Sequence, residues 1–203
     1  MRKLLFCVLM MSLLLTACGG EEENRAEELA LTVRGEYLAA QSCAGTAALT
    51  ADYGQRICRY EVEFTSNEEE TVLTLTAPET VAGITARLLA KEGSLLEYDG
   101  AILETGELDG EGLTPVSAIP AILERVREGF LDSCVLEEEE GQPARLRLCI
   151  RDPEQELGHG VETTLWFDPD SHKLLRGEIS RDGFCVIQCE FTSFEIVTSG
   201  EVT

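Results

Sequence analysis

Polar and apolar residues alternate along several stretches of the chain, a pattern typical of strands with one buried face. The clearest stretch runs from Arg56 to Phe64, where charged residues at 59, 61 and 63 separate apolar ones. Short turns such as Asp99-Gly100 join neighbouring stretches. Ten strands are expected, at 56–64, 70–76, 80–90, 95–98, 101–104, 130–137, 144–151, 161–167, 173–180 and 185–196. The pattern therefore predicts a mainly β (α+β) fold with a single antiparallel sheet of about ten strands, which should curl.

Two stretches show the period of a helix instead. The first spans 24–41 and opens with Asn24 and Glu27, spaced as in a capping box. The second follows Thr114-Pro115, which resembles an N-cap and a first helical position. Pro120 lies within this second stretch and predicts a kink or a short turn before the main helix. Since a curled sheet needs cover on its apolar face, both helices are expected on the concave side.

The first 17 residues are typical of a secretion signal. Arg2 and Lys3 precede an apolar run at 4–15, which is shorter than the roughly 20 residues of a membrane-spanning helix. The string Leu15-Thr16-Ala17-Cys18 resembles the lipobox of bacterial lipoproteins, in which the cysteine thiol is joined to diacylglycerol before cleavage. The resemblance implies that residues 1–17 are removed and that Cys18 carries the lipid. The alternative is an ordinary signal peptide that ends in a cysteine by chance.

An anchor at Cys18 sets the expected domain boundaries. The acidic run Glu21–Glu23 predicts a solvated tether over 18–24, followed by a domain at 25–197 and a loose tail at 198–203. Two or more acyl chains give stable membrane attachment. The expected location is the extracytoplasmic face of the cell membrane, or the periplasmic side of a membrane if the source has two.

The charge of the chain limits its partners. Residues 1–17 hold two of the 16 basic residues and none of the 38 acidic ones, so their removal changes the net charge from −22 to −24. A surface of this charge repels phosphate backbones, and no nucleic acid partner is expected.

Six cysteines remain once Cys7 leaves with the signal and Cys18 is acylated. Outside the cytosol they could form up to three disulfides, in any of 15 pairings. Setting Val135 opposite Leu148 in the predicted hairpin places Cys134 opposite Cys149, which makes this pair the best disulfide candidate.

The sequence lacks the motifs of common active sites, including G-x-S-x-G, H-E-x-x-H, the Walker loop and C-x-x-C. His159 and His172 both lie in expected loops, without the spacing of metal ligands. We therefore predict no catalytic residue, no cofactor and no metal, and a protein that is not an enzyme.

Three strings resemble the LolA/LolB-like lipoprotein carrier superfamily. They are "LLEYDGAILETG" at 95–106, "LTPVSAIPAIL" at 113–123 and "LWFDPDSHKLLRGEI" at 165–179. In that superfamily a half-open β-barrel is closed by a helical lid and its concavity holds acyl chains. The resemblance implies the same half-barrel for residues 25–197, with the second helix as the lid.

Two functions follow from these expectations. The first is a membrane-anchored binding protein for an acyl chain or another apolar ligand on the concave face of the sheet. The alternative is a non-catalytic scaffold with a filled core, whose partner is an envelope protein. The residues expected to line the ligand site are Tyr60, Val62, Phe64, Leu73 and Leu75.

Overall fold

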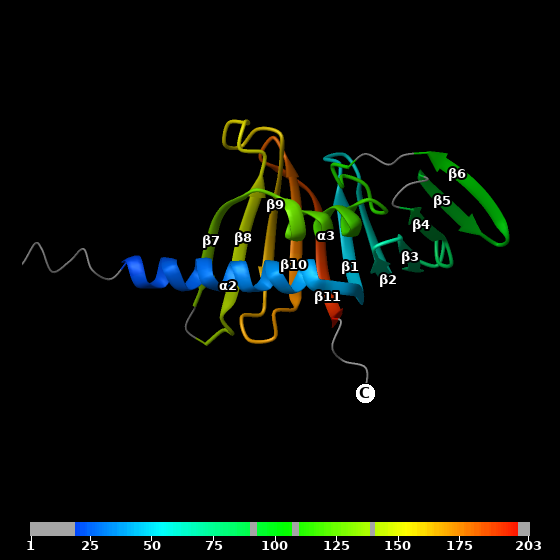
Figure 1. Cartoon of the computed structure of the whole chain (residues 1–203). Coiled ribbons are helices and arrows are strands. Elements are labelled where there is room, and N and C mark those ends of the chain that lie inside the picture. The colour runs from blue at the N-terminus through cyan, green and yellow to red at the C-terminus, as the bar shows by residue number, and fades with distance from the viewer. Residues whose placement is uncertain (1–18, 90–92, 107–109, 139–140, 199–203) are drawn as a thin grey trace, which may run out of the picture.

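In the part of the chain that the structure describes, eleven antiparallel strands form one sheet, and two helices lie against one of its faces (Figure 1). The computed structural model describes residues 19–89, 93–106, 110–138 and 141–198. The helices are α2 (Gly19–Ala39) and α3 (Ala118–Glu128). The strands are β1 (Ala40–Asp52), β2 (Ile57–Asn67), β3 (Glu70–Ala77), β4 (Thr85–Leu89), β5 (Gly93–Tyr98), β6 (Ala101–Gly106), β7 (Leu131–Glu137), β8 (Arg145–Arg151), β9 (Val161–Phe167), β10 (Leu174–Arg181) and β11 (Phe184–Thr198).

The sheet is open. Its order is β6-β5-β4-β3-β2-β1-β11-β10-β9-β8-β7, so β1 lies near the centre while β6 and β7 are the two edges. The predicted fold class is confirmed: a single antiparallel sheet, not closed into a barrel, with an N-terminal and a middle helix. We call the face that carries the helices the inner face and the opposite one the outer face.

One central strand, β1, is absent from the sequence prediction. Apart from Leu49, its inner face is built from small residues, and Cys43, Ala47 and Ala51 are fully buried there. Small side chains give little hydrophobic contrast, so the alternation that marks β2 is faint in β1. The strand is held by its two neighbours, pairing with β2 from Ser42 to Asp52 and with β11 along most of its length.

The first helix starts earlier than the sequence predicts. It begins at Gly19, so the residues expected to form a solvated tether after Cys18 belong to α2. Glutamate is a good helix former, and a helix can therefore extend through this acidic run beyond the capping signal at Asn24. Cys18 itself lies outside the described residues.

Small residues let α2 approach the sheet closely. The buried residues of α2 recur at helical spacing and are Ala26, Ala30, Val33 and Tyr37. The helix lies against β7, β8 and β11. The Tyr37 hydroxyl accepts a hydrogen bond from the Leu174 backbone N–H at 3.1 Å. Because α2 is bound through both apolar contacts and a backbone hydrogen bond, its position on the inner face is fixed.

Two arginines connect the helices. Arg34 on α2 donates from Nε to the Val126 carbonyl at 3.0 Å and from Nη2 to the Gly129 carbonyl at 2.7 Å, at the C-terminal end of α3. In return, Arg127 on α3 donates to the Tyr37 carbonyl in the last turn of α2 at 3.0 Å. Each helix thus binds carbonyl groups that the other leaves without a partner inside its own helix.

The second helix packs directly on β10. A Cβ atom at Gly177 would lie only 2.8 Å from Cδ1 of Ile122 on α3, so the glycine lets Ile122 pack against the strand without shifting. Pro120 lies in the first turn of α3 and a turn at 115–117 precedes the helix, as the proline predicts.

We expect Arg34→Ala to lower the free energy of unfolding by about 2 kcal/mol, since hydrogen bonds from a charged donor contribute about 1.5–3 kcal/mol. Urea unfolding followed by the fluorescence of Trp166, the single tryptophan, measures the change. Arg25→Ala is the matched control on the same helix. Arg25 pairs with Glu138 across 3.5 Å with its side chain 70% exposed, and such pairs contribute little. Equal effects of the two substitutions would contradict the role given to Arg34.

Candidate functional site

The five residues predicted to line a ligand site come together on the inner face of β2 and β3. Val62, Phe64, Leu73 and Leu75 are buried, and Tyr60 is partly buried against the same core. Residues of both helices belong to that core. The structure therefore places these side chains in packed protein, and their role in ligand binding stays a prediction.

The apolar inner face continues from this core to the edge of the sheet. The strand register places Phe64, Leu73, Ala86, Leu96 and Leu103 opposite one another on successive strands from β2 to β6. Cross-strand partners share a face, so these residues form one row, which we call the apolar row. Phe64 is 3% exposed, Leu96 is half-buried and Leu103 is 63% exposed. The apolar row thus runs out of the core into solvent.

The position of the helices explains this gradient. The longer helix, α2, contacts β7, β8 and β11, and α3 packs on β10, while β4, β5 and β6 extend beyond both helices (Figure 1). Tyr98, two residues after Leu96 on β5, is 52% exposed on the same face. Ala86, the member of the row on β4, is still buried, so the exposed end lies on β5 and β6, two strands roughly 5 Å apart at the usual strand spacing. The sequence carries a signal of this exposure, since Ile102 and Leu103 are consecutive apolar residues in a short strand and cannot both be buried by one face.

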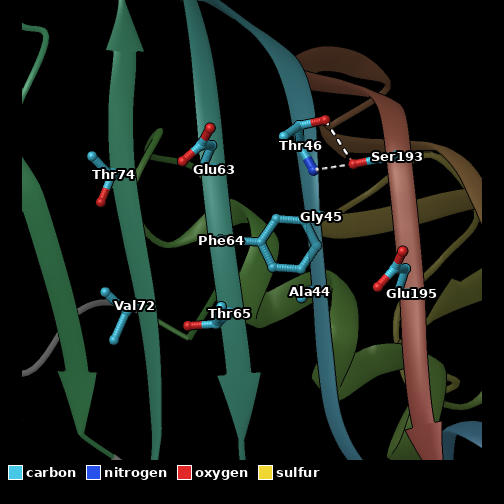
Figure 2. Close-up of a pocket in the computed structure, with 10 residues that line it drawn as sticks. All are labelled: Ala44, Gly45, Thr46, Glu63, Phe64, Thr65, Val72, Thr74, Ser193 and Glu195. Carbon is cyan, nitrogen blue, oxygen red and sulfur yellow. Dashed lines mark hydrogen bonds between the residues drawn. The ribbon is translucent and has the colours of Figure 1, made fainter.

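A second candidate lies on the outer face. An open pocket of about 390 Å³ lies over β11, β1, β2 and β3. Figure 2 shows it with helix behind the sheet. Its lining mixes polar and apolar side chains, with the carboxylates of Glu63 and Glu195 on either side of β1. Phe64 borders it from the inner side, because its ring packs over Gly45.

The hydroxyl groups beside this pocket are already engaged with one another. Thr46 Oγ1 lies 2.7 Å from Thr192 Oγ1 and 2.8 Å from Ser193 Oγ, at an irregularity in the pairing of β1 with β11. Ser193 Oγ also accepts from the Thr46 backbone N–H at 3.1 Å. This network contains no base that could activate a hydroxyl. Across the described ranges, no group of three or more histidine, cysteine or acidic residues could hold a metal ion.

A third candidate, a pocket of about 310 Å³, is lined by three arginines at the end of the sheet where β8 and β10 finish. All three are engaged by neighbouring groups, and the carboxylates of Glu111 and Asp152 line the same pocket. Arg151 pairs with Asp132 at 2.7 Å and Arg181 pairs with Glu111, and Arg125 donates to Thr163 Oγ1 at 2.7 Å. The pocket therefore offers little excess positive charge to an anion.

The predicted disulfide pairing rests on a register that proves wrong by one residue. The structure pairs Cys134 with Leu148 and Cys149 with Ser133. Since neighbouring residues of a strand point to opposite faces, Cys134 and Cys149 lie on different sides of the sheet, and both are free. The shift buries Cys134 and Leu136 against the core and leaves Val135 at 42% exposure.

Two other thiols are buried deeply enough to be unreactive. Burial raises the pKa of the Cys189 thiol far above its ordinary value. Burial also raises the pKa of Cys43, an effect that the nearby Arg127 guanidinium reduces. Because the thiolate is the reactive form, neither group is a candidate nucleophile.

Solved structures with a similar course of the chain come from several bacteria. A lipoprotein-sorting protein domain of the outer membrane from Vibrio parahaemolyticus is 11% identical, with a TM-score of 0.48 over 87% of this chain and 95% of that one. A DUF1329 family protein from Desulfovibrio piger is 10% identical, with a TM-score of 0.46 over 90% and 95% of the two chains. A LolA superfamily protein from Nitrosomonas europaea is 10% identical, with a TM-score of 0.45 over 85% and 93%.

The TM-scores are all below 0.5, and at this similarity the neighbours say nothing of function. No protein-family model matches the chain, and no curated protein matches it. Neither helix of the described residues is long and apolar enough to cross a membrane.

We expect Cys189 and Cys43 to stay unmodified when the folded protein is alkylated at pH 8, after the half-buried Cys58 has reacted. Their raised pKa values and burial both suppress the reaction. Mass spectrometry of the peptides, without reduction, measures each thiol and would also detect any disulfide. Equal labelling of all six thiols in folded protein would contradict the packing described for β1 and β11.

Proposed function

We propose that the protein is an envelope lipoprotein, anchored through Cys18, that binds an apolar ligand on the exposed end of the apolar row. The observation that carries this proposal is the continuity of the inner face from the buried core to Leu103, which is 63% exposed. Large apolar surfaces left open to water are typical of interaction sites. The site differs from the predicted lining on β2 and β3, since it lies on β5 and β6.

The chemistry of this surface favours a neutral acyl chain over an anionic amphiphile. Leu96, Tyr98 and Leu103 offer aliphatic and aromatic carbon, with the Tyr98 hydroxyl as a polar group at one side. Glu97 and Glu104 occupy the outer face of the same hairpin, and the whole chain carries a net charge of −22. An anionic head group would be repelled here, whereas an ester- or amide-linked chain would not.

A second function is a scaffold with a filled core and a protein partner. The burial of Val62, Leu73 and Leu75 favours it, because these predicted lining residues already have protein neighbours. In that case the exposed end of the apolar row would contact a partner protein in place of a small ligand.

Leu103→Gln should weaken the binding of a neutral naphthylamine dye about tenfold or more. Burial of a leucine side chain contributes about 1.5–3 kcal/mol, and each tenfold change in affinity corresponds to about 1.4 kcal/mol. Fluorescence titration of the full chain measures the affinity. Ile102→Gln is the matched control, because Ile102 is 66% exposed on the opposite face of the same strand.

Equal dye affinity for both variants and the wild type would reject the ligand site. Native mass spectrometry of the protein extracted from its own membranes adds a second readout. The ligand function is supported if the wild type carries a bound apolar compound that the Leu103→Gln variant lacks. The scaffold is favoured if the wild type carries no such compound and binds no dye.

The anchor has a test of its own. We expect Cys18→Ala to remove the mass of the acyl chains and to release the protein from the membrane fraction, since acylation needs the thiol. Fractionation with mass spectrometry of the intact protein checks both effects. Retention of the variant in the membrane with an unchanged N-terminal mass would show that Cys18 is not the attachment point.

A further inference from the structure

The two edges of the open sheet are protected to different degrees. At β7, α2 lies across the strand, and Asp132 interrupts the register between Leu131 and Ser133. Charged and irregular edges of this kind resist pairing with another chain. At β6, by contrast, Ala101 to Thr105 are all exposed, Glu104 is the only charge among them, and the irregularity in the pairing with β5 lies beyond Glu104, at Thr105.

The turn before β6 fixes which of its backbone groups are free to pair. Asp99 and Gly100 both have positive φ, 49° and 77°, as in a type I′ hairpin turn. Such a turn is closed by a hydrogen-bonded pair, here Tyr98 with Ala101. Hydrogen-bonded pairs alternate along an antiparallel ladder, so the next one joins Leu96 and Leu103. The N–H and C=O groups of Ile102 and Glu104 therefore point away from β5, toward the open edge.

We infer that β6 pairs antiparallel with β6 of a second copy of this chain, with Leu103 of each copy on the twofold axis. This register sets Ile102 of each copy opposite Glu104 of the other. The N–H and C=O groups of both residues then form hydrogen bonds, in two hydrogen-bonded pairs. Leu103 faces Leu103 in the pair between them, on the inner face.

The side chains of β6 favour this register over its neighbours. A shift that sets Glu104 opposite Glu104 places like charges together, which is destabilising. A shift that sets Ile102 opposite Ile102 moves the axis toward the Asp99-Gly100 turn and shortens the ladder. Centring on Leu103 pairs Ile102, Leu103 and Glu104 before the irregularity at Thr105, and this part of β6 is thus self-complementary.

A second copy fits this edge because each copy offers the same free backbone groups and the same exposed leucine. The strand is short, so the interface falls below the roughly 1,200 Å² of stable complexes and the pairing is transient in dilute solution. Pairing also joins the exposed ends of the two apolar rows at the axis. The inference rests on the β6 edge and stands whether or not a ligand binds there.

Disulfide trapping in native membranes tests the register. Full-length Leu103→Cys, treated with a mild oxidant, should form a covalent dimer that the wild type, with its own cysteines, does not form. Ile102→Cys is the matched control. The residue opposite residue 102 in the second copy is residue 104. The two Cα atoms of residue 102 are therefore offset by two positions and lie roughly 8 Å apart, which is too far for a disulfide. Co-expression of Ile102→Cys with Glu104→Cys should restore the dimer.

A proline in place of Ile102 separates edge pairing from folding. The Ile102 N–H points outward, so Ile102→Pro removes no hydrogen bond to β5, and proline is tolerated on edge strands. Added to Leu103→Cys, it should abolish the dimer while Trp166 fluorescence and the urea midpoint stay as in the single variant. The dimer yield of Leu103→Cys should also rise with salt, because both copies carry a net charge of −22.

Three results would overturn the inference. The first is an equal dimer yield from Leu103→Cys and Ile102→Cys. The second is a dimer of Leu103→Cys that persists after Ile102→Pro is added, in a chain that is still folded. The third is a crosslinked product whose mass is that of this chain joined to a different protein. Dye binding is measured separately from dimer formation. A missing dimer therefore does not contradict the proposed ligand site, and missing dye binding does not contradict the pairing of β6.

Discussion

An eleven-stranded sheet has more apolar surface on one face than two helices can cover, and this constraint shapes the molecule. The larger helix has 21 residues and the smaller 11. Arg34 on the larger helix binds a carbonyl group at the end of the smaller one, and Arg127 on the smaller helix binds one at the end of the larger. The two helices therefore act as one cover. Tyr37 and Gly177 place that cover over β7 to β11. Strands β3 to β6 lie beyond the helices, where loop residues such as Val81 and Ile84 pack against the core, and at β6 the inner face is exposed.

The sequence predicts most of this architecture because alternation is strong wherever large apolar residues face charged ones, as in β2. It fails at β1, the strand near the centre. Cys43, Ala47 and Ala51 are fully buried yet too small to mark a strand, and Gly45 has no side chain at all. The close approach of Phe64 and of the Ser193 carbonyl to Gly45 explains this composition. A crowded centre needs small residues, and small residues weaken the pattern from which strands are predicted.

The candidate site shows a different limit. Alternation identifies Val62, Phe64 and Leu73 as inner residues correctly, but it does not say whether protein or solvent lies above them. That depends on where the helices dock, which is decided by contacts between residues far apart in the chain, such as Arg34 with Gly129. The disulfide candidate fails for a related reason. A change of one residue in register exchanges the two faces of a strand, and the β7–β8 loop leaves that register open in the sequence.

The uncovered inner face and the unprotected edge meet at one residue, Leu103, and this links binding to association. A ligand that lies along one apolar row contacts a single copy and leaves pairing unchanged. A ligand long enough to cross the axis contacts both copies and therefore binds the pair more tightly than the single chain. By linkage, such a ligand must favour pairing by the same factor by which pairing favours the ligand. The helices, fixed over the other half of the sheet, take no part in this coupling, so it is confined to the hairpin of β5 and β6.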